Sequence, residues 1–173
     1  IGYPLSGRGN RRSRALYARV RALYPNFSDA EVESWLLATR AQGVDHNLEL
    51  QRLSAELDTL REYLSLWTQQ AQGLMETSER SSLRDALMAA WRRQSQRVAN
   101  QVGEPIGYRL ILWSVPMRRL LELPENVRFG HIRSLSMSCM SLEEIPESFM
   151  AVFSGLQSLA LTNNELTRLP PAV

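Results

Sequence analysis

A spaced pattern of apolar residues occurs three times in the last third of the chain. Its most complete copy follows the spacing L-x-x-L-x-L-x-x-N-x-L-x-x-L-P and consists of Leu156, Leu159, Leu161, Asn164, Leu166, Leu169 and Pro170. An earlier copy consists of Ile132, Leu135, Met137, Met140, Leu142, Ile145 and Pro146. The first copy consists of Leu110, Trp113, Val115, Arg118, Leu120, Leu123 and Pro124. The copies start 22 and 24 residues apart, and such periods are typical of leucine-rich repeats.

Each repeat of this kind lays down one short strand whose leucines point inward and stack on the neighbouring repeats. We therefore predict a mainly α-helical chain with a short α/β leucine-rich-repeat solenoid over residues 105–173, truncated at its C-terminal end. Residues 1–104 are expected to form a helical bundle that caps the N-terminal end of the repeats. Because Ile1 is not an initiator methionine and Val173 follows the last repeat directly, the sequence is interpreted as a fragment of a longer protein.

Alternation along each expected strand predicts which side chains face solvent on the concave side of the repeats. This candidate partner-binding surface comprises Leu112, Ser114, Pro116, Ser134, Ser136, Ser138, Ser158, Ala160 and Thr162. These residues are mostly small and weakly polar, so the surface lacks the aromatic and arginine anchors typical of binding hot spots. The main contacts are therefore expected in repeats beyond Val173 or elsewhere on the chain. The Asn164 side chain is expected to bind backbone groups where the chain leaves the strand.

Apolar spacing predicts four helices before the repeats. The first covers Arg12–Tyr24, and the second opens at the capping box of Ser28 and Glu31 and ends near Gly43. The third covers roughly residues 46–72, is capped by Asp45, and carries a heptad seam. The seam consists of Leu50, Leu53, Leu57, Leu60, Leu64 and Trp67.

The fourth helix is expected from about Ser82 to Val102, with Gly103 after its end. Tryptophans on successive helices usually share one core, so we expect Trp35, Trp67 and Trp91 to pack together. The first repeat would have an open strand edge, and the helices are expected to cover it. Trp113 is expected near that junction.

The basic residues are concentrated at the N-terminal end. All 20 cations of the chain are arginines, and six of them lie within residues 8–21, where there is no acid. A helix of this kind could lie on nucleic acid or an anionic membrane, and this stays open as the alternative function. We favour a bundle helix whose arginine stems surround a buried stripe, because the following segments supply acids. Accordingly, neither nucleic acid nor a membrane span is expected.

The composition argues against catalysis by this chain. Cys139 is its only cysteine, and His46 and His131 are isolated, so we expect no disulfide, no metal site and no cofactor. No carboxylate pair, nucleophile with a base, or glycine-rich phosphate loop falls on one face, so no catalytic residue is expected. Cys139 is interpreted as a small packing residue at the edge of a strand.

The lysine-free helical segment and the repeats ending in Leu-Pro together resemble bacterial leucine-rich-repeat effectors of the novel E3 ubiquitin ligase type. The resemblance is to large members with a dermonecrotic-toxin-like N-terminal region. The stretch Ala22-Leu23-Tyr24-Pro25-Asn26-Phe27-Ser28-Asp29-Ala30-Glu31-Val32 is similar to the segment that such chains carry before their repeats.

The resemblance implies a virulence protein that a type III-like system secretes into the host cytosol, where thiols stay reduced. Its repeats would act as a protein–protein interaction and substrate-recognition module for a host protein. In this family a separate C-terminal domain takes ubiquitin from a charged E2 on the cysteine of a Cys-x-Asp motif. Because Met140 and Ser141 follow Cys139, that motif is absent and no catalytic role carries over.

Overall fold

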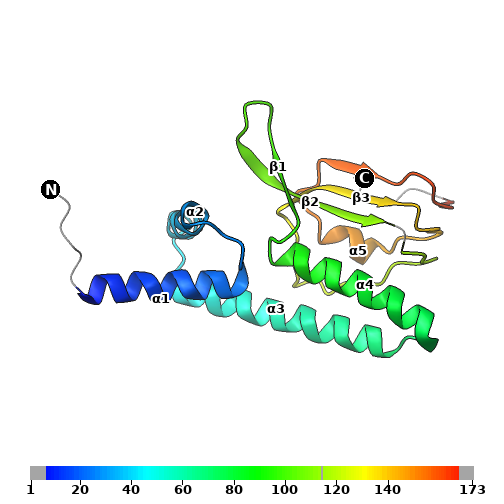
Figure 1. Ribbon diagram of the computed structural model, residues 1–173, viewed down its shortest axis with the longest axis horizontal. Helices are drawn as coiled ribbons and strands as arrows, with labels where there is room; N and C mark the ends of the chain where they lie inside the picture. The colour runs from blue at the N-terminus through cyan, green and yellow to red at the C-terminus, as the bar shows by residue number, and fades with distance from the viewer. Residues whose placement is uncertain (1–6, 114, 168–173) are drawn as a thin grey trace.

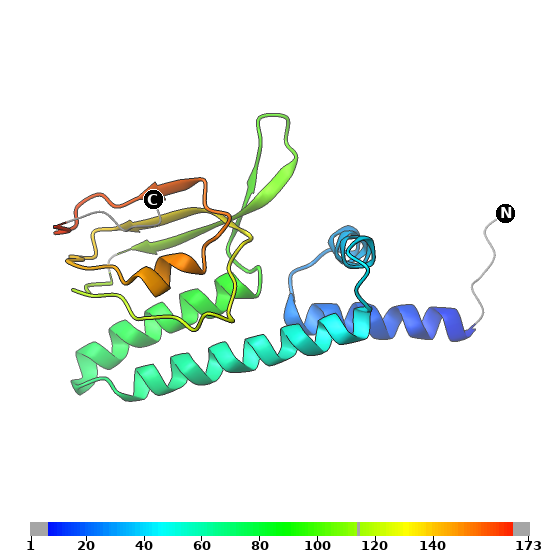
Figure 2. The ribbon, with the colours of Figure 1, turned by 180° about the vertical axis from the view of Figure 1, so that it is seen from behind.

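The computed structural model of the chain describes residues 7–113 and 115–167. Within them the chain forms five helices and four strands. In chain order these are α1 (Gly7–Leu23), α2 (Asp29–Ala41), α3 (His46–Gln69), α4 (Gly73–Trp91), β1 (Gln96–Ala99), β2 (Pro105–Trp113), β3 (Ile132–Ser138), α5 (Glu147–Ala151) and β4 (Ser158–Ala160). The helices α1 and α3 run along the length of the molecule, and α4 and α5 lie on one side of the sheet (Figures 1 and 2).

The predicted solenoid with a helical cap is wrong, because the described strands form one small mixed sheet. The strand order is β1-β2-β3-β4, in which β1 runs antiparallel to β2 while β2, β3 and β4 are parallel. Residues 96–99 were expected to continue a helix, but they occupy the outer edge of β2 instead. A strand therefore covers residues 105–109 of the edge that the helices were expected to cover, and the expected boundary at residue 104 falls inside a β-hairpin.

The fourth helix begins and ends earlier than its apolar spacing suggests. It covers Gly73–Trp91 rather than about 82–102. Beyond Trp91 the chain leaves the helix at Arg93, whose φ of 57° is left-handed. The hairpin then turns at Asn100–Gly103, where the Gly103 amide donates to the Asn100 carbonyl at 3.0 Å and Gly103 has a φ of 83°. Glycine adopts this φ without strain, which explains a turn where we expected a helix stop.

The second and third helices begin as their capping residues predict. Ser28 and Glu31 form the reciprocal capping box of α2. Asp45 caps α3 by accepting from the amides of Asn47 and Leu48 at 3.1 and 3.2 Å. Each cap satisfies backbone donors that have no partner within the helix.

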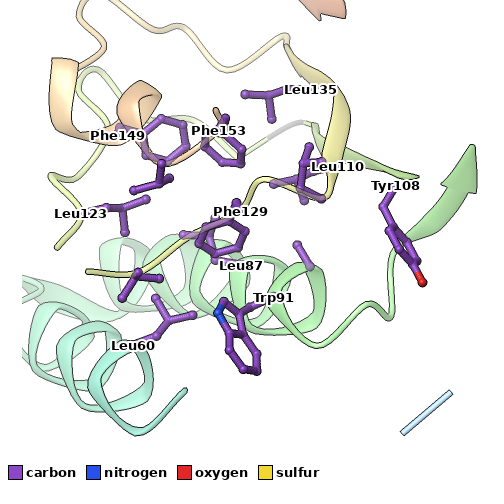
Figure 3. Packing of buried hydrophobic residues seen from close by; sticks show 14 of the residues in the cluster. Leu60, Leu87, Trp91, Tyr108, Leu110, Leu123, Phe129, Leu135, Phe149 and Phe153 are labelled. Carbon is purple, nitrogen blue, oxygen red and sulfur yellow. The ribbon is translucent and has the colours of Figure 1, made fainter. Parts of the chain in front are cut away.

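The hydrophobic core joins the helices to the sheet (Figure 3). The leucines of the α3 seam are buried, and α3 packs against α1, α2 and α4, while α4 packs against β2. The residues of this core that Figure 3 labels are Leu60, Leu87, Trp91, Tyr108, Leu110, Leu123, Phe129, Leu135, Phe149 and Phe153. Of the three tryptophans expected to share a core, only Trp91 is fully buried; Trp35 and Trp67 are half-buried.

The buried carboxylate of Glu56 connects three parts of the chain. It lies on α3, accepts from Trp91 of α4, and accepts from the backbone N–H of Arg128 before β3 at 3.3 Å. His131, which precedes β3, adds a hydrogen bond of 2.6 Å between its Nε2 and the Ala90 carbonyl. These contacts fix the sheet against the helices.

Candidate protein-binding face

The sheet has an open face, which we define as its side away from α4 and α5. In β2 the side chains of Tyr108, Leu110 and Leu112 are buried, so Arg109, Ile111 and Trp113 lie on the open face. The prediction that Leu112 is exposed is therefore wrong: its exposed fraction is 1%.

The error at Leu112 comes from the register of β2 against β3. Leu110 pairs with Leu135. The copies of the repeated pattern start at Leu110 and Ile132, so their spacing placed Leu110 opposite Ile132, three residues earlier. A shift by an odd number of residues exchanges the two faces of a strand. Residues 110–113 read Leu-Ile-Leu-Trp, so the sequence offers no polar alternation that would fix the face. Between β3 and β4 the expected offset of 24 residues is observed, since Ser134 pairs with Ser158.

The other predicted surface residues have different outcomes. Ser134, Ser136 and Ser138 are half-buried on the open face, and Ser158 and Ala160 are exposed beside them. Thr162 is exposed just after β4, and Pro116 is exposed beyond the end of β2. Ser114 lies outside the described residues.

Sequence reasoning missed two large apolar side chains on this face. Ile111 is 52% exposed and Trp113 is 66% exposed, although Trp113 was expected near the junction with the helices. Their partners in the neighbouring strand are Ser136 and Ser138, whose small side chains leave the Ile and Trp side chains projecting above them. The open face thus has the anchor residues that the sequence prediction lacked.

Hydroxyl groups link β3 to the chain after β4 across the face. The Ser138 hydroxyl lies 2.8 Å from that of Thr162, and the Ser136 and Ser138 hydroxyls lie 3.4 Å apart. Beneath them, Asn164 accepts from the amides of Met140 and Leu142 at 3.1 and 3.2 Å, which confirms its predicted role. These bonds hold the open face in one arrangement.

Charge is distributed unevenly along the strands. Arg109 lies in the middle of β2, level with Ser134 near the start of β3, and Arg133 is the second residue of β3. Neither takes part in an ion pair with the described residues. Arg133 donates to the carbonyl oxygens of Ile106 and Gly155 at 3.1 and 3.0 Å. Beyond the other end of the strands, Arg118 faces Glu143 at 3.7 Å, and Arg119 faces Glu144 at the same distance. One end of the face is therefore positive and the other is balanced.

The remaining titratable candidates form no reactive cluster in the described part of the chain. Burial, aided by the nearby Arg93 cation, lowers the pKa of His131 to about 3, so this histidine is neutral near pH 7. Cys139 is exposed at the end of β3 rather than packed, and the Asn163 amide donates to its Sγ at 3.4 Å. No group of three or more metal-ligating side chains occurs among the described residues.

The arginine-rich segment is described only in part, since the side chains described in α1 begin at Arg14. Arg21 pairs with Asp29 and donates to the Phe27 carbonyl at 3.0 Å, and Arg19 donates to Asn47. These two cations thus bind later segments, as expected for a helix packed within the protein. No described helix has the length and apolarity needed to cross a membrane.

A hollow of about 780 Å³ lies between the α3–α4 turn and residues 116–121. Its walls carry charges of both signs, including Glu76 and Arg80, which pair with each other at 2.8 Å. The Arg80 guanidinium also covers the Trp67 ring, 4.8 Å from its centroid. Because Glu76, Arg80 and Trp67 already contact one another, they have less capacity to bind a ligand. The open face is therefore the stronger candidate for a binding site.

The chain matches no protein-family model, no curated protein and no solved structure. Its functional interpretation therefore depends on the geometry of the open face.

Proposed function

We propose that this chain is a protein-binding module that recognises its partner through the open face of the sheet. The observation that carries the proposal is the exposure of Ile111 and Trp113 beside each other on one strand. Tryptophan is the residue type most enriched among side chains that dominate binding energies. An exposed apolar patch rimmed by polar residues is typical of interaction sites.

The surroundings of these two residues suit a protein partner. The serines of β3 are small enough to let a partner approach closely, and their hydroxyls can donate or accept hydrogen bonds. The backbone of β2 is held by β3 along residues 108–113, by β1 along residues 105–109 and by the core beneath it, so little ordering is needed on binding. A rigid aromatic anchor in a polar rim favours recognition over catalysis.

The proposal includes the wider role that the sequence resemblance implies. In this wider role, the chain is the substrate-recognition part of a secreted bacterial effector similar to E3 ubiquitin ligases, and its partner is a host protein. The similarity of residues 22–32 to such effectors supports this role, and the absence of lysine is compatible with it. The chain itself performs no ubiquitin transfer, because Cys139 lacks a base and a Cys-x-Asp motif.

A displayed random-peptide library selected against the folded chain tests the binding function. Dissociation constants of the recovered peptides are then measured for the wild type, Trp113→Ala and Leu74→Ala. Leu74 is 91% exposed at the start of α4, which makes it a matched control for loss of an exposed apolar side chain. We expect Trp113→Ala to weaken binding about tenfold or more and Leu74→Ala to leave it unchanged. Peptides that bind both variants equally well would contradict the proposal.

A further inference from the structure

The charge distribution of the open face points to the chemistry of its partner, and this inference rests on the proposed function. We propose that the face binds a protein segment that presents a carboxylate beside a large apolar side chain. The carboxylate pairs with Arg109, and the apolar side chain packs on Ile111 and Trp113.

The spacing of the three residues fits such a segment. Arg109, Ile111 and Trp113 alternate with buried residues along β2, so they line one side of a single strand. Side chains two residues apart on a strand face are about 6.5–7 Å apart. A carboxylate and an apolar side chain on one side of an extended segment have the same spacing. One short segment can therefore contact the cation and the apolar pair together.

Arg109 forms no ion pair with any described residue, which distinguishes it from its neighbour Arg97. Arg97 belongs to β1, and its guanidinium pairs with Glu31 at 3.0 Å. Arg109 is half-buried, and the residues paired with it in the sheet are the neutral Gln96 and Ser134. Arg133, which occupies the register shift beside it, adds a second cation without an ion pair among the described residues. An incoming carboxylate is thus attracted to this end of the face.

The other end of the face sets the direction of the segment. Glu143 and Glu144 lie beyond the ends of the strands, where Arg118 and Arg119 balance them. An acidic side chain gains little binding energy there, whereas Trp113, the last residue of β2, offers an exposed apolar ring. The partner therefore places its carboxylate at Arg109, in the middle of β2, and its apolar side chain where β2 ends.

Single-stranded nucleic acid also combines anionic groups with rings that stack on tryptophan. Its phosphates need a track of cations along their path, whereas the cations on the described strands of the open face are two neighbours, Arg109 and Arg133. Beyond the other end of the strands, Arg118 and Arg119 already face Glu143 and Glu144, so these arginines attract phosphates only weakly. A protein segment with one carboxylate fits this distribution better.

A double-mutant cycle tests the proposed pairing. Peptides selected from the displayed library are synthesised with each acidic residue in turn changed to its amide. Each peptide is titrated against the wild type, Arg109→Gln and, as a control, Arg14→Gln, because Arg14 is an exposed arginine on α1. We expect Arg109→Gln to weaken the acidic peptide about fivefold and the amide peptide hardly at all. Arg14→Gln should change neither.

The outcomes separate this inference from the proposed function. Peptides that require Trp113 but bind Arg109→Gln as tightly as the wild type would overturn the inference and leave the binding function standing. A library that yields no Trp113-dependent peptide would overturn both. A fluorescent single-stranded oligonucleotide that binds in a Trp113-dependent manner, more tightly than any selected peptide, would also overturn the inference.

Discussion

The carboxylate of Glu56 accepts a hydrogen bond of 2.6 Å from the indole Nε1 of Trp91, and both side chains are buried. The same carboxylate accepts from the Arg128 amide at 3.3 Å and pairs with Arg52 at 3.2 Å. A buried charge is tolerated only when its hydrogen-bonding capacity is used. This one carboxylate therefore couples α3, α4 and the segment that leads into β3.

Replacing Glu56 with alanine should weaken this coupling. The Trp91 and Arg128 N–H groups would lose their acceptor, and each unsatisfied buried donor costs roughly 1–3 kcal/mol. We expect Glu56→Ala to lower the free energy of unfolding by roughly 2–4 kcal/mol, measured by urea denaturation. Glu56→Gln keeps one carbonyl oxygen as an acceptor and should lose less. Equal losses in the two variants would show that the hydrogen bonds contribute little.

The seam of α3 supplies a second test of stability. Leu60 is fully buried at its centre, and truncating a buried leucine to alanine costs roughly 2–5 kcal/mol through lost burial and the cavity left behind. Glu62 is exposed on the same helix, and its replacement by alanine should change stability by no more than about 0.5 kcal/mol. Similar denaturation midpoints for the two variants would mean that α3 packs through another face.

His131 should make stability depend on pH. Its pKa is about 3 in the folded chain, chiefly because of burial and then because of the Arg93 cation, with Arg133 contributing a little. The pKa of an unfolded histidine is about 6.5, so the unfolded state binds the proton first as the pH falls. The stabilising contribution is complete above pH ~6.5 and is lost towards pH ~3, with a slope of up to about 1.4 kcal/mol per pH unit.

This pH dependence is measured by comparing the wild type with His131→Gln between pH 7 and 4. Glutamine can still donate to the Ala90 carbonyl but does not titrate. The difference between the two curves removes the contribution of carboxylates such as Glu31, whose pKa is lowered by hydrogen bonds from Ser28 and Arg97 in spite of its desolvation. Parallel curves would contradict a neutral buried His131.

Cys139 should be dispensable. It is exposed at the end of β3, and its thiol receives one hydrogen bond, from the Asn163 side chain. We expect Cys139→Ser to unfold at the same denaturant concentration as the wild type, within about 0.5 kcal/mol, and to bind selected peptides equally well. Wild-type chain incubated with ubiquitin, E1 and E2 should show no thioester on a non-reducing gel. A thioester that Cys139→Ser abolishes would contradict the proposal that this chain only recognises its partner.

Local signals in the sequence predicted where α2 and α3 begin. The capping residues Ser28 and Asp45 act within a few residues of themselves, so their effect is visible without knowledge of the fold. The β1–β2 hairpin was missed because Leu83, Leu87, Trp91 and Val98 continue a helical spacing across the point where Arg93 ends the helix. Pairing with β2, a contact made through the following turn, decides the conformation of residues 96–99.

The candidate face was predicted only where polar alternation exists. Ser134, Ser136 and Ser138 alternate with buried Leu135 and Met137, so their exposed side was clear from the sequence. The run Leu110–Trp113 is apolar on both faces of its strand, and the pairing of β2 with β3 alone decides which side chains are exposed. Trp113 and Arg109 therefore emerged as surface residues only from the fold.

Acrylamide quenching of tryptophan fluorescence tests the binding role of Trp113 most directly. Trp113 is 66% exposed, whereas Trp91 is fully buried and Trp35 and Trp67 are half-buried. Quenching is measured with and without a saturating selected peptide that lacks tryptophan, for the wild type and for Trp113→Phe. We predict that the peptide lowers the quenching of the wild type and leaves that of Trp113→Phe nearly unchanged. Wild-type quenching that stays the same at full occupancy would contradict binding at the open face.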